Sequence, residues 1–354
     1  MSERFVSGAT PFEFRGNAKE WFGIWIVNLL LTIVTIGIYS AWAKVRAKKY
    51  FYNHTYVEGR NFDYHATGKQ ILIGRLIVIA AIIVFQLIAA FAPILALVLL
   101  LGFLALFPWL IVRSLMFNAR MSSFSNVRFG FDGSVGKAFL LFLLYPILVA
   151  FTAYLTFPIL DRAINRYSIN NHRLGQARFN MEVGLSPFYM AFLAALGWII
   201  VVGLIGVLAT GFNFMEFANA MEGRGGDPAE LIKVMVLFYA LFFAAFLPAA
   251  FLYQAMTRNA VYNNTTLEGG HRFASNVTAP KLMWIALSNM VVVVCTLFLM
   301  LPWAQVRMAR YLADHTGFIA GGSLDDFVTQ QGGKAGAVGD AYTDLEGVDV
   351  GLPI

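Results

Sequence analysis

The chain has 354 residues, of which 59% are hydrophobic and 13% are charged, and its formal net charge is +6. A soluble globular protein has about 45–50% apolar and roughly 25% charged residues, so this chain has more apolar side chains than a water-facing globule can bury. The composition excludes a soluble enzyme, a nucleic-acid-binding module and a disordered chain. It predicts an α-helical polytopic membrane protein.

Seven apolar segments are long enough to span a bilayer, which requires a helix of about 20 residues. In chain order they are Trp21–Ala41, Ile71–Ala92, Ile94–Phe117, Ala138–Leu160, Phe188–Thr210, Leu231–Met256 and Leu282–Leu301. The first is longer than the core of a cleavable signal peptide, so we expect it to be retained as a transmembrane helix. Pro93 marks the expected turn between the second and third segments.

Four loops between these segments share one pattern: a short run containing Asn, a break rich in Gly or Ser, and an aromatic run. They are residues 52–64, 117–131, 170–179 and 262–273. The pattern is typical of β-hairpins, and Pro11–Gly16 resembles a single strand of the same kind. An isolated hairpin is marginal in water, so we expect the hairpins to pair with one another or to lie on the membrane surface.

The chain also contains related segments. A shift of 117 residues aligns Phe12 with Phe129, Tyr50 with Tyr167 and Phe62 with Phe179, and a shift of 261 aligns Phe12 with Phe273, Arg46 with Arg307 and Tyr50 with Tyr311. We interpret these as three related repeats of a strand, a helix and a basic segment. The predicted organisation is an N-terminal strand segment (1–20), a first repeat unit with helices 1–3 (21–118), a second with helices 4–6 (119–256), a third partial repeat with helix 7 (257–318) and an acidic C-terminal tail (319–354).

Two arrangements of the repeated helices are open at this point. If all seven segments span, neighbouring repeats run in opposite directions, as in many transporters. If the repeated helices re-enter, all hairpins share one face and could form one sheet. Spanning is favoured because Trp21–Ala41 and Leu282–Leu301 have no interruption. The basic residues after the first segment then predict a periplasmic N-terminus and a cytoplasmic C-terminus.

Equivalent polar residues occur inside the repeated helices. Asn28, Tyr145 and Asn289 share one repeat position, and Thr35, Thr152 and Thr296 share another seven residues later. A spacing of seven places each pair on one helical face, and polar groups in hydrocarbon turn inward. Two interpretations follow: hydrogen bonds between helices, or a polar cavity lined by these six residues.

Basic residues follow two of the repeated helices. Lys44, Arg46, Lys48, Lys49, Arg307 and Arg310 are candidates for contacts with anionic lipid headgroups. This distribution favours membrane lipids as partners and indicates no nucleic acid.

The sequence predicts no enzyme. The five histidines lie in loops or flanking segments without metal-ligand spacing, the single cysteine is Cys295, and the motifs of nucleophilic catalysis or phosphate binding are absent. We therefore assign no catalytic residue, no metal ligand and no cofactor.

Several motifs resemble the YjgN family of bacterial inner-membrane proteins, a domain of unknown function. They are Phe12–Gly16, Asn28–Tyr39, Trp42–Ala43, Arg46 and Tyr50. The family usually has Pro at the position of Ala41. The resemblance covers nearly the whole chain and implies a multipass protein of the inner membrane, without an established activity.

Two functional hypotheses remain. The first is a transporter or channel for a small solute or lipid. The alternative is a structural or partner-binding protein that docks another membrane protein through its hairpins and acidic tail.

Overall fold

The computed structural model describes residues 8–211, 213–222 and 228–332. In that part of the chain, eleven strands form one antiparallel sheet in the order β1-β11-β10-β9-β8-β7-β6-β5-β4-β3-β2. The first and last strands in this order, β1 (Thr10–Pro11) and β2 (Glu13–Phe14), belong to one segment interrupted only at Phe12. The Phe12 N–H donates to the Thr316 carbonyl at 2.8 Å. The sheet is therefore a nearly closed barrel.

The barrel is built from five consecutive units, each with a long strand, a helical hairpin and a short strand. The segment Thr10–Phe14 is the first long strand, and the others are β4 (Arg60–Tyr64), β6 (Val127–Phe131), β8 (Ala177–Met181) and β10 (His271–Ser275). The short strands are β3 (Thr55–Val57), β5 (Ser122–Phe124), β7 (His172–Leu174), β9 (Thr265–Leu267) and β11 (Thr316–Ile319).

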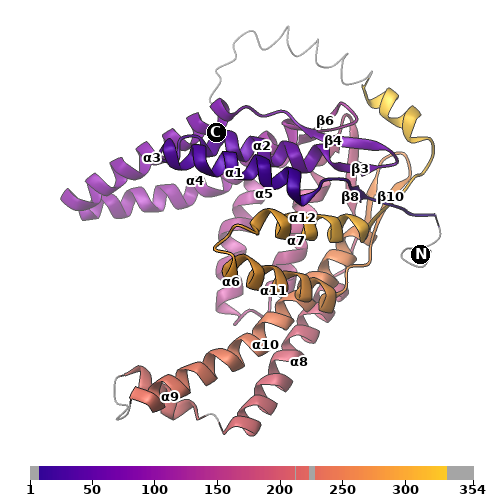
Figure 1. Cartoon of the computed structure of the whole chain (residues 1–354). Helices are drawn as coiled ribbons and strands as arrows, with labels where there is room; N and C mark the ends of the chain where they lie inside the picture. The colour runs from indigo at the N-terminus through magenta and orange to yellow at the C-terminus, as the bar shows by residue number, and fades with distance from the viewer. Residues whose placement is uncertain (1–7, 212, 223–227, 333–354) are drawn as a thin grey trace.

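Each hairpin has a first helix that leaves the barrel and a second helix that returns to it (Figure 1). The first helices are α1 (Ala18–Val34), α3 (Gly68–Phe91), the run α5 (Val135–Phe139), η1 (Leu140–Leu144) and α6 (Tyr145–Phe151), then α8 (Ser186–Thr210) and α11 (Ala279–Cys295). The second helices are α2 (Ser40–Asn53), α4 (Pro93–Arg120), α7 (Phe157–Asn170), α10 (Pro228–Asn263) and α12 (Leu301–Asp314), and α9 (Phe214–Met221) precedes α10. In the third unit the π-helix η1 stands just before Pro146, which cannot donate to the carbonyl four residues earlier.

The connectivity places all five helical hairpins at one end of the barrel and the strand-to-strand turns at the other. All four of these turns contain residues in the left-handed conformation, as tight turns between twisted strands require. They are Glu58 with Gly59, Ser125 with Asn126, Gly175, and Gly269 with Gly270. A further helix over residues 324–332 lies against the turn end (yellow in Figure 1). The last 22 residues of the predicted acidic tail, 333–354, lie outside the described residues.

Two of the hairpins are long. The helices α3, α4 and α8, together with Leu231–Asn263 of α10, are long and apolar enough to cross a membrane, and most of their apolar surface is uncovered by the rest of the chain. Within each long hairpin the two helices pack against each other. These four helices make the protein multipass.

The other three hairpins are short and turn back. Where the sequence predicts one continuous span, the chain reverses at residues 35–39, 152–156 and 296–300. Each reversal contains two successive residues with positive φ, such as Ile36 and Gly37 in the first and Leu297 and Phe298 in the third. The tips are apolar and exposed, with Ile36 93% and Leu297 83% accessible. Each of these hairpins therefore returns to the barrel instead of continuing as one long helix.

The prediction of seven transmembrane helices in three repeats with short hairpins in the loops is therefore wrong. Four helices have the length and hydropathy of spans, and the loop strands join into the eleven-stranded sheet. Thr10 pairs with Phe318 in adjacent strands, so the first and last described strands lie side by side and not on opposite sides of a membrane. An even number of crossings returns the chain to the side from which it started.

Candidate functional site

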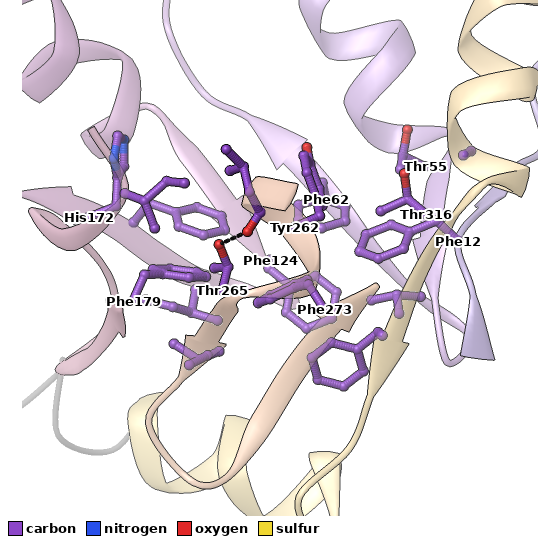
Figure 2. A pocket seen from close by; sticks show the side chains of 18 of the residues that line it. Phe12, Thr55, Phe62, Phe124, His172, Phe179, Tyr262, Thr265, Phe273 and Thr316 are labelled. Atoms are coloured by element: carbon purple, nitrogen blue, oxygen red, sulfur yellow. Dashed lines mark hydrogen bonds between the residues drawn. The ribbon is translucent and has the colours of Figure 1, made fainter. Parts of the chain in front are cut away.

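A ring of phenylalanines lines the middle of the barrel. Each long strand contributes its third residue, namely Phe12, Phe62, Phe129, Phe179 and Phe273. Successive ring centroids from Phe12 to Phe273 are 6.0–6.4 Å apart, within contact range for aromatic pairs. Figure 2 shows several of these side chains converging on one space from different strands. Alternation along each strand directs this residue inward.

A second ring, of polar side chains, lies next to the phenylalanines on the helical side. The first residue of every short strand is polar and bonds to the backbone carbonyl four residues earlier, at the end of the second helix. The five are Thr55, Ser122, His172, Thr265 and Thr316, with distances of 2.6–2.8 Å. The short strands thus begin with a side chain that ends the preceding helix and faces the interior.

Two adjoining cavities occupy this interior, with volumes of about 670 Å³ and 500 Å³. The two cavities share lining residues from both rings, namely Phe12, Phe62, Phe129, Thr55 and His172. Their outer walls are formed by the second helices. The wall residues lie three, four or seven positions before the polar-ring residue that follows each helix. Members of this wall are Tyr52, Ala119, Asn165, Ile169, Arg258, Tyr262, Ala309 and Ala313. This spacing is the inward face of a helix.

His172 is the titratable member of the polar ring. Its Nδ1 lies 2.6 Å from the Ser168 carbonyl, which only accepts, so Nδ1 carries the proton. Burial lowers the pKa of His172, so the ring is neutral at neutral pH. Its Nε2 is then a hydrogen-bond acceptor, and His172 lines both cavities.

The turn end of the barrel is closed by the helix over residues 324–332. Leu324 and Phe327 are buried in the barrel core and line the larger cavity. The Gln331 side chain accepts from the Gln176 N–H at 2.8 Å, and Asp325 pairs with Arg60. The part of the tail that the structure describes is thus an internal floor of the barrel as well as an acidic surface.

The six residues of the predicted polar cavity lie within the three short hairpins, and none of them lines either cavity described above. Asn289 donates to the Ala304 carbonyl and accepts from Arg307, and Asn28 accepts from Arg46. The hydroxyls of Thr35 and Thr296 accept N–H groups at the turns of their hairpins, Thr152 bonds to Thr156, and Tyr145 is exposed. A ligand role for these six stays a prediction, and their present bonds stabilise each hairpin internally.

The residues expected at lipid headgroups lie on α2 and α12. Arg46 and Arg307 point back to their own hairpins, Arg310 donates to the Gly16 carbonyl, and Lys48 bonds to Asn118. Burial lowers the pKa of Lys48, and the neighbouring charge of Lys44 lowers it further. No hydrogen bond or ion pair is formed by Lys44 or Lys49 within the described residues, so these two are available to lipid headgroups.

The comparisons identify the family. A model described as "Bacterial protein of unknown function (DUF898)" matches residues 9–345. The chain belongs to this family. It is 27% identical to Inner membrane protein YjgN of Salmonella typhimurium strain LT2, over 86% of this chain and 87% of that protein. It is 25% identical to the protein of the same name from Escherichia coli O157:H7 and 24% identical to that from strain K12, in each case over 89% of both chains. No solved structure matches.

These findings confirm the resemblance drawn from the opening motifs, and with the four spans they establish a multipass protein of the inner membrane. They bring no activity. In the described residues no group of three His, Cys, Asp or Glu side chains is placed to hold a metal ion.

Sequence reasoning missed the barrel cavity and Arg258. The equal spacing of Phe12 from Phe129 and of Phe62 from Phe179 is the signal that could have located the ring, because an identical residue kept at the same strand position faces the same side of a sheet. Arg258 carries no such signal, since the other four units have Lys48, Leu115, Asn165 and Ala309 at its position.

Proposed function

We propose that the protein binds one lipid-like or other apolar molecule in the barrel cavity, as a step in moving a small solute or lipid at the inner membrane. The observation that supports the proposal is the cavity itself. Its volume of about 670 Å³ lies within the roughly 300–1,000 Å³ of small-molecule sites, which are mostly apolar with a few placed polar groups. The phenylalanine ring and the polar ring supply these two kinds of surface.

The position of the cavity supports a membrane source for the ligand. The outer walls are the bases of the second helices, and these helices continue into hairpins that enter the hydrocarbon. An apolar molecule that reaches the cavity from the bilayer loses little by leaving the acyl chains, since the phenylalanines offer an equally dry surface. We therefore propose that the cavity binds such a molecule and does not convert it.

The alternative, docking of another protein through the hairpins, has less support. Because β1 and β2 complete the sheet, the described strands present little free edge to a partner strand. Docking through residues 333–354 stays a prediction, as these lie outside the described residues.

A blocking variant tests the proposal. Ala309 lines both cavities, so Ala309→Trp fills the space without removing any contact. The matched control is Ala105→Trp, because Ala105 is exposed on α4. Both proteins are purified in nanodiscs, titrated with an environment-sensitive apolar fluorophore, and extracted for mass spectrometry of bound lipids.

We expect the wild type and Ala105→Trp to bind the fluorophore with one site and to retain a lipid, and Ala309→Trp to lose both. Equal binding by all three proteins, or no binding by the wild type, would contradict the proposal. Thermal unfolding of each variant reports whether it has folded.

A further inference from the structure

Arg258 brings an unneutralised positive charge to the larger cavity. It lies on α10, seven residues before the polar-ring residue Thr265, and it lines the cavity wall. Among the described residues that line the two cavities, it is the one arginine, and no Lys, Asp or Glu accompanies it. No carboxylate of the described residues lies within ion-pair distance of its guanidinium.

The guanidinium is held in place by neutral groups. Its Nη2 donates to the Thr316 hydroxyl at 2.7 Å, and its Cζ lies 4.2 Å from the ring centroid of Tyr262. The Thr316 hydroxyl in turn donates to the Leu312 carbonyl at 2.6 Å. These contacts orient the guanidinium and leave its charge without a counter-charge.

One of its donors has no partner. The Nε atom of Arg258 is inaccessible to solvent and forms no hydrogen bond with the described residues. A buried donor without a partner costs about 1–3 kcal/mol, and more when the group is charged, so an unpaired atom of this kind requires an explanation. Nε is covered, so a ligand meets the remaining N–H donors on the two Nη atoms, and a guanidinium binds carboxylate and phosphate oxygens with pairs of such donors.

We propose that the cavity ligand is an anionic amphiphile whose carboxylate or phosphate headgroup binds Arg258 and whose apolar chain lies among the phenylalanines. This inference rests on the proposed function, since it names the class of molecule that the same cavity takes. Asn165 and His172 line the same cavity. Their free polar atoms, Oδ1 and Nε2, accept hydrogen bonds, so they suit a hydroxyl group of the ligand, while Arg258 donates to its anionic oxygens. Phe129 and Phe273 line the part that the chain would fill.

The test compares ligands that share one chain and differ in the headgroup. The full-length protein in nanodiscs is titrated with palmitate, with 1-palmitoyl lysophosphatidate, with neutral monopalmitin and with inorganic phosphate alone. Arg258→Gln removes the charge, and Arg258→Lys retains it without the two-pronged geometry. Arg272→Gln is the matched control, because Arg272 is exposed on strand β10.

We expect the wild type to bind at least one of the two anionic amphiphiles about tenfold more tightly than monopalmitin, which corresponds to one charge-assisted hydrogen-bonded pair. Arg258→Gln should remove this preference and leave monopalmitin binding unchanged, Arg258→Lys should keep part of it, and Arg272→Gln should keep all of it. The preferred anionic amphiphile identifies the headgroup as carboxylate or phosphate.

Two results would overturn the inference while leaving the proposed function intact: equal binding of monopalmitin and the anionic amphiphiles by the wild type, or an unchanged preference in Arg258→Gln. Binding of inorganic phosphate as tight as that of lysophosphatidate would show a free-anion site instead. Failure of every amphiphile to bind the wild type would remove the proposed function itself. If Arg258→Gln does not fold, headgroup analysis of lipids retained by the wild type decides the question, since enrichment of neutral lipids would contradict it.

Discussion

Three tyrosines hold the two helices of each short hairpin together where the hairpin meets the barrel. Loss of each hydroxyl is predicted to lower the stability of the protein by an amount that depends on the number of its hydrogen bonds. Tyr50, Tyr167 and Tyr311 are buried near the ends of the second helices. Each hydroxyl bonds to the backbone of the residue 33 positions earlier, which caps the first helix of the same hairpin. Removing a hydroxyl therefore releases both ends of one hairpin from each other.

The number of bonds sets the expected order. Tyr50 accepts from the Asn17 N–H at 3.0 Å, and its single hydroxyl hydrogen is shared between the Asn17 carbonyl at 3.0 Å and the Glu20 carboxylate at 3.3 Å. Tyr311 accepts from the Thr278 N–H at 3.1 Å and donates to the Thr278 carbonyl at 3.3 Å. Tyr167 makes one such bond, to the Ser134 carbonyl at 3.0 Å. At about 1 kcal/mol for each bond, the Tyr→Phe substitution should cost about 2 kcal/mol at positions 50 and 311 and about 1 kcal/mol at position 167.

These costs are measured by thermal unfolding of the purified protein. In a chain of this size roughly 2 °C of Tm corresponds to 1 kcal/mol, so we expect decreases of about 4 °C for Tyr50→Phe and Tyr311→Phe and about 2 °C for Tyr167→Phe. Tyr145→Phe is the control, because Tyr145 is exposed and its hydroxyl has no hydrogen bond to a described residue. Losses no larger than that of the control, or the largest loss at Tyr167, would refute the reasoning.

Two further predictions concern topology and pH. Both topology variants are made in a Cys295→Ser background and treated with an impermeant maleimide. Glu222→Cys should be labelled from the side opposite the barrel, and Ile36→Cys, at the tip of the first short hairpin, should not be labelled from either side. Labelling of Ile36→Cys from the same side as Glu222→Cys would support the seven-span arrangement instead. His271 accepts the Gly321 N–H at its Nδ1 and packs against Phe327, and burial lowers its pKa despite the nearby Glu58. As the pH falls, the unfolded state binds a proton at His271 before the folded state does. The contribution of His271 to folding stability is therefore fully present above pH ~6.5 and is lost as the pH falls below that value. Hydrogen exchange of residues 321–332, corrected for intrinsic rates, should be faster at pH 5.5 than at pH 7.5, and equal protection at the two pH values would show that His271 does not hold the tail.

The sequence predicted the local elements better than their assembly. Aromatic alternation on both sides of a turn located strands such as β4 and β8 within a few residues, because strand periodicity is a local property. Pairing of the hairpins with one another was one of the two expected outcomes, and the sheet confirms it. The closing of that sheet by Thr10–Phe14 depends on contacts with strand β11, some 300 residues later, which no local pattern reports.

The reversals within the three short hairpins were missed for a physical reason. Hydropathy averages over a window, and the tips contain Ile36, Ile38 and Leu297, which are as apolar as the helices that flank them. A β-branched residue such as Ile36 rarely adopts positive φ, so its identity argues against the turn that it forms. The hydroxyl of Thr35, which accepts the Tyr39 N–H, is the local compensation, yet the same Thr also fits within a helix.

Different forces hold the short hairpins together and hold the tail on the barrel, and the force on the tail links it to the cavity. The tyrosine bonds that join the two helices of each short hairpin are polar and fixed in direction. At the turn end the ion pair of Arg60 with Asp325 is exposed and contributes at most about 1 kcal/mol, whereas burial of Leu324 and Phe327 contributes roughly 1.5–3 kcal/mol each. Apolar burial thus holds the tail, and it uses surface of the same cavity that a ligand chain would fill. Any molecule that displaces Phe327 weakens tail docking, and by reciprocity the docked tail weakens its binding by the same factor.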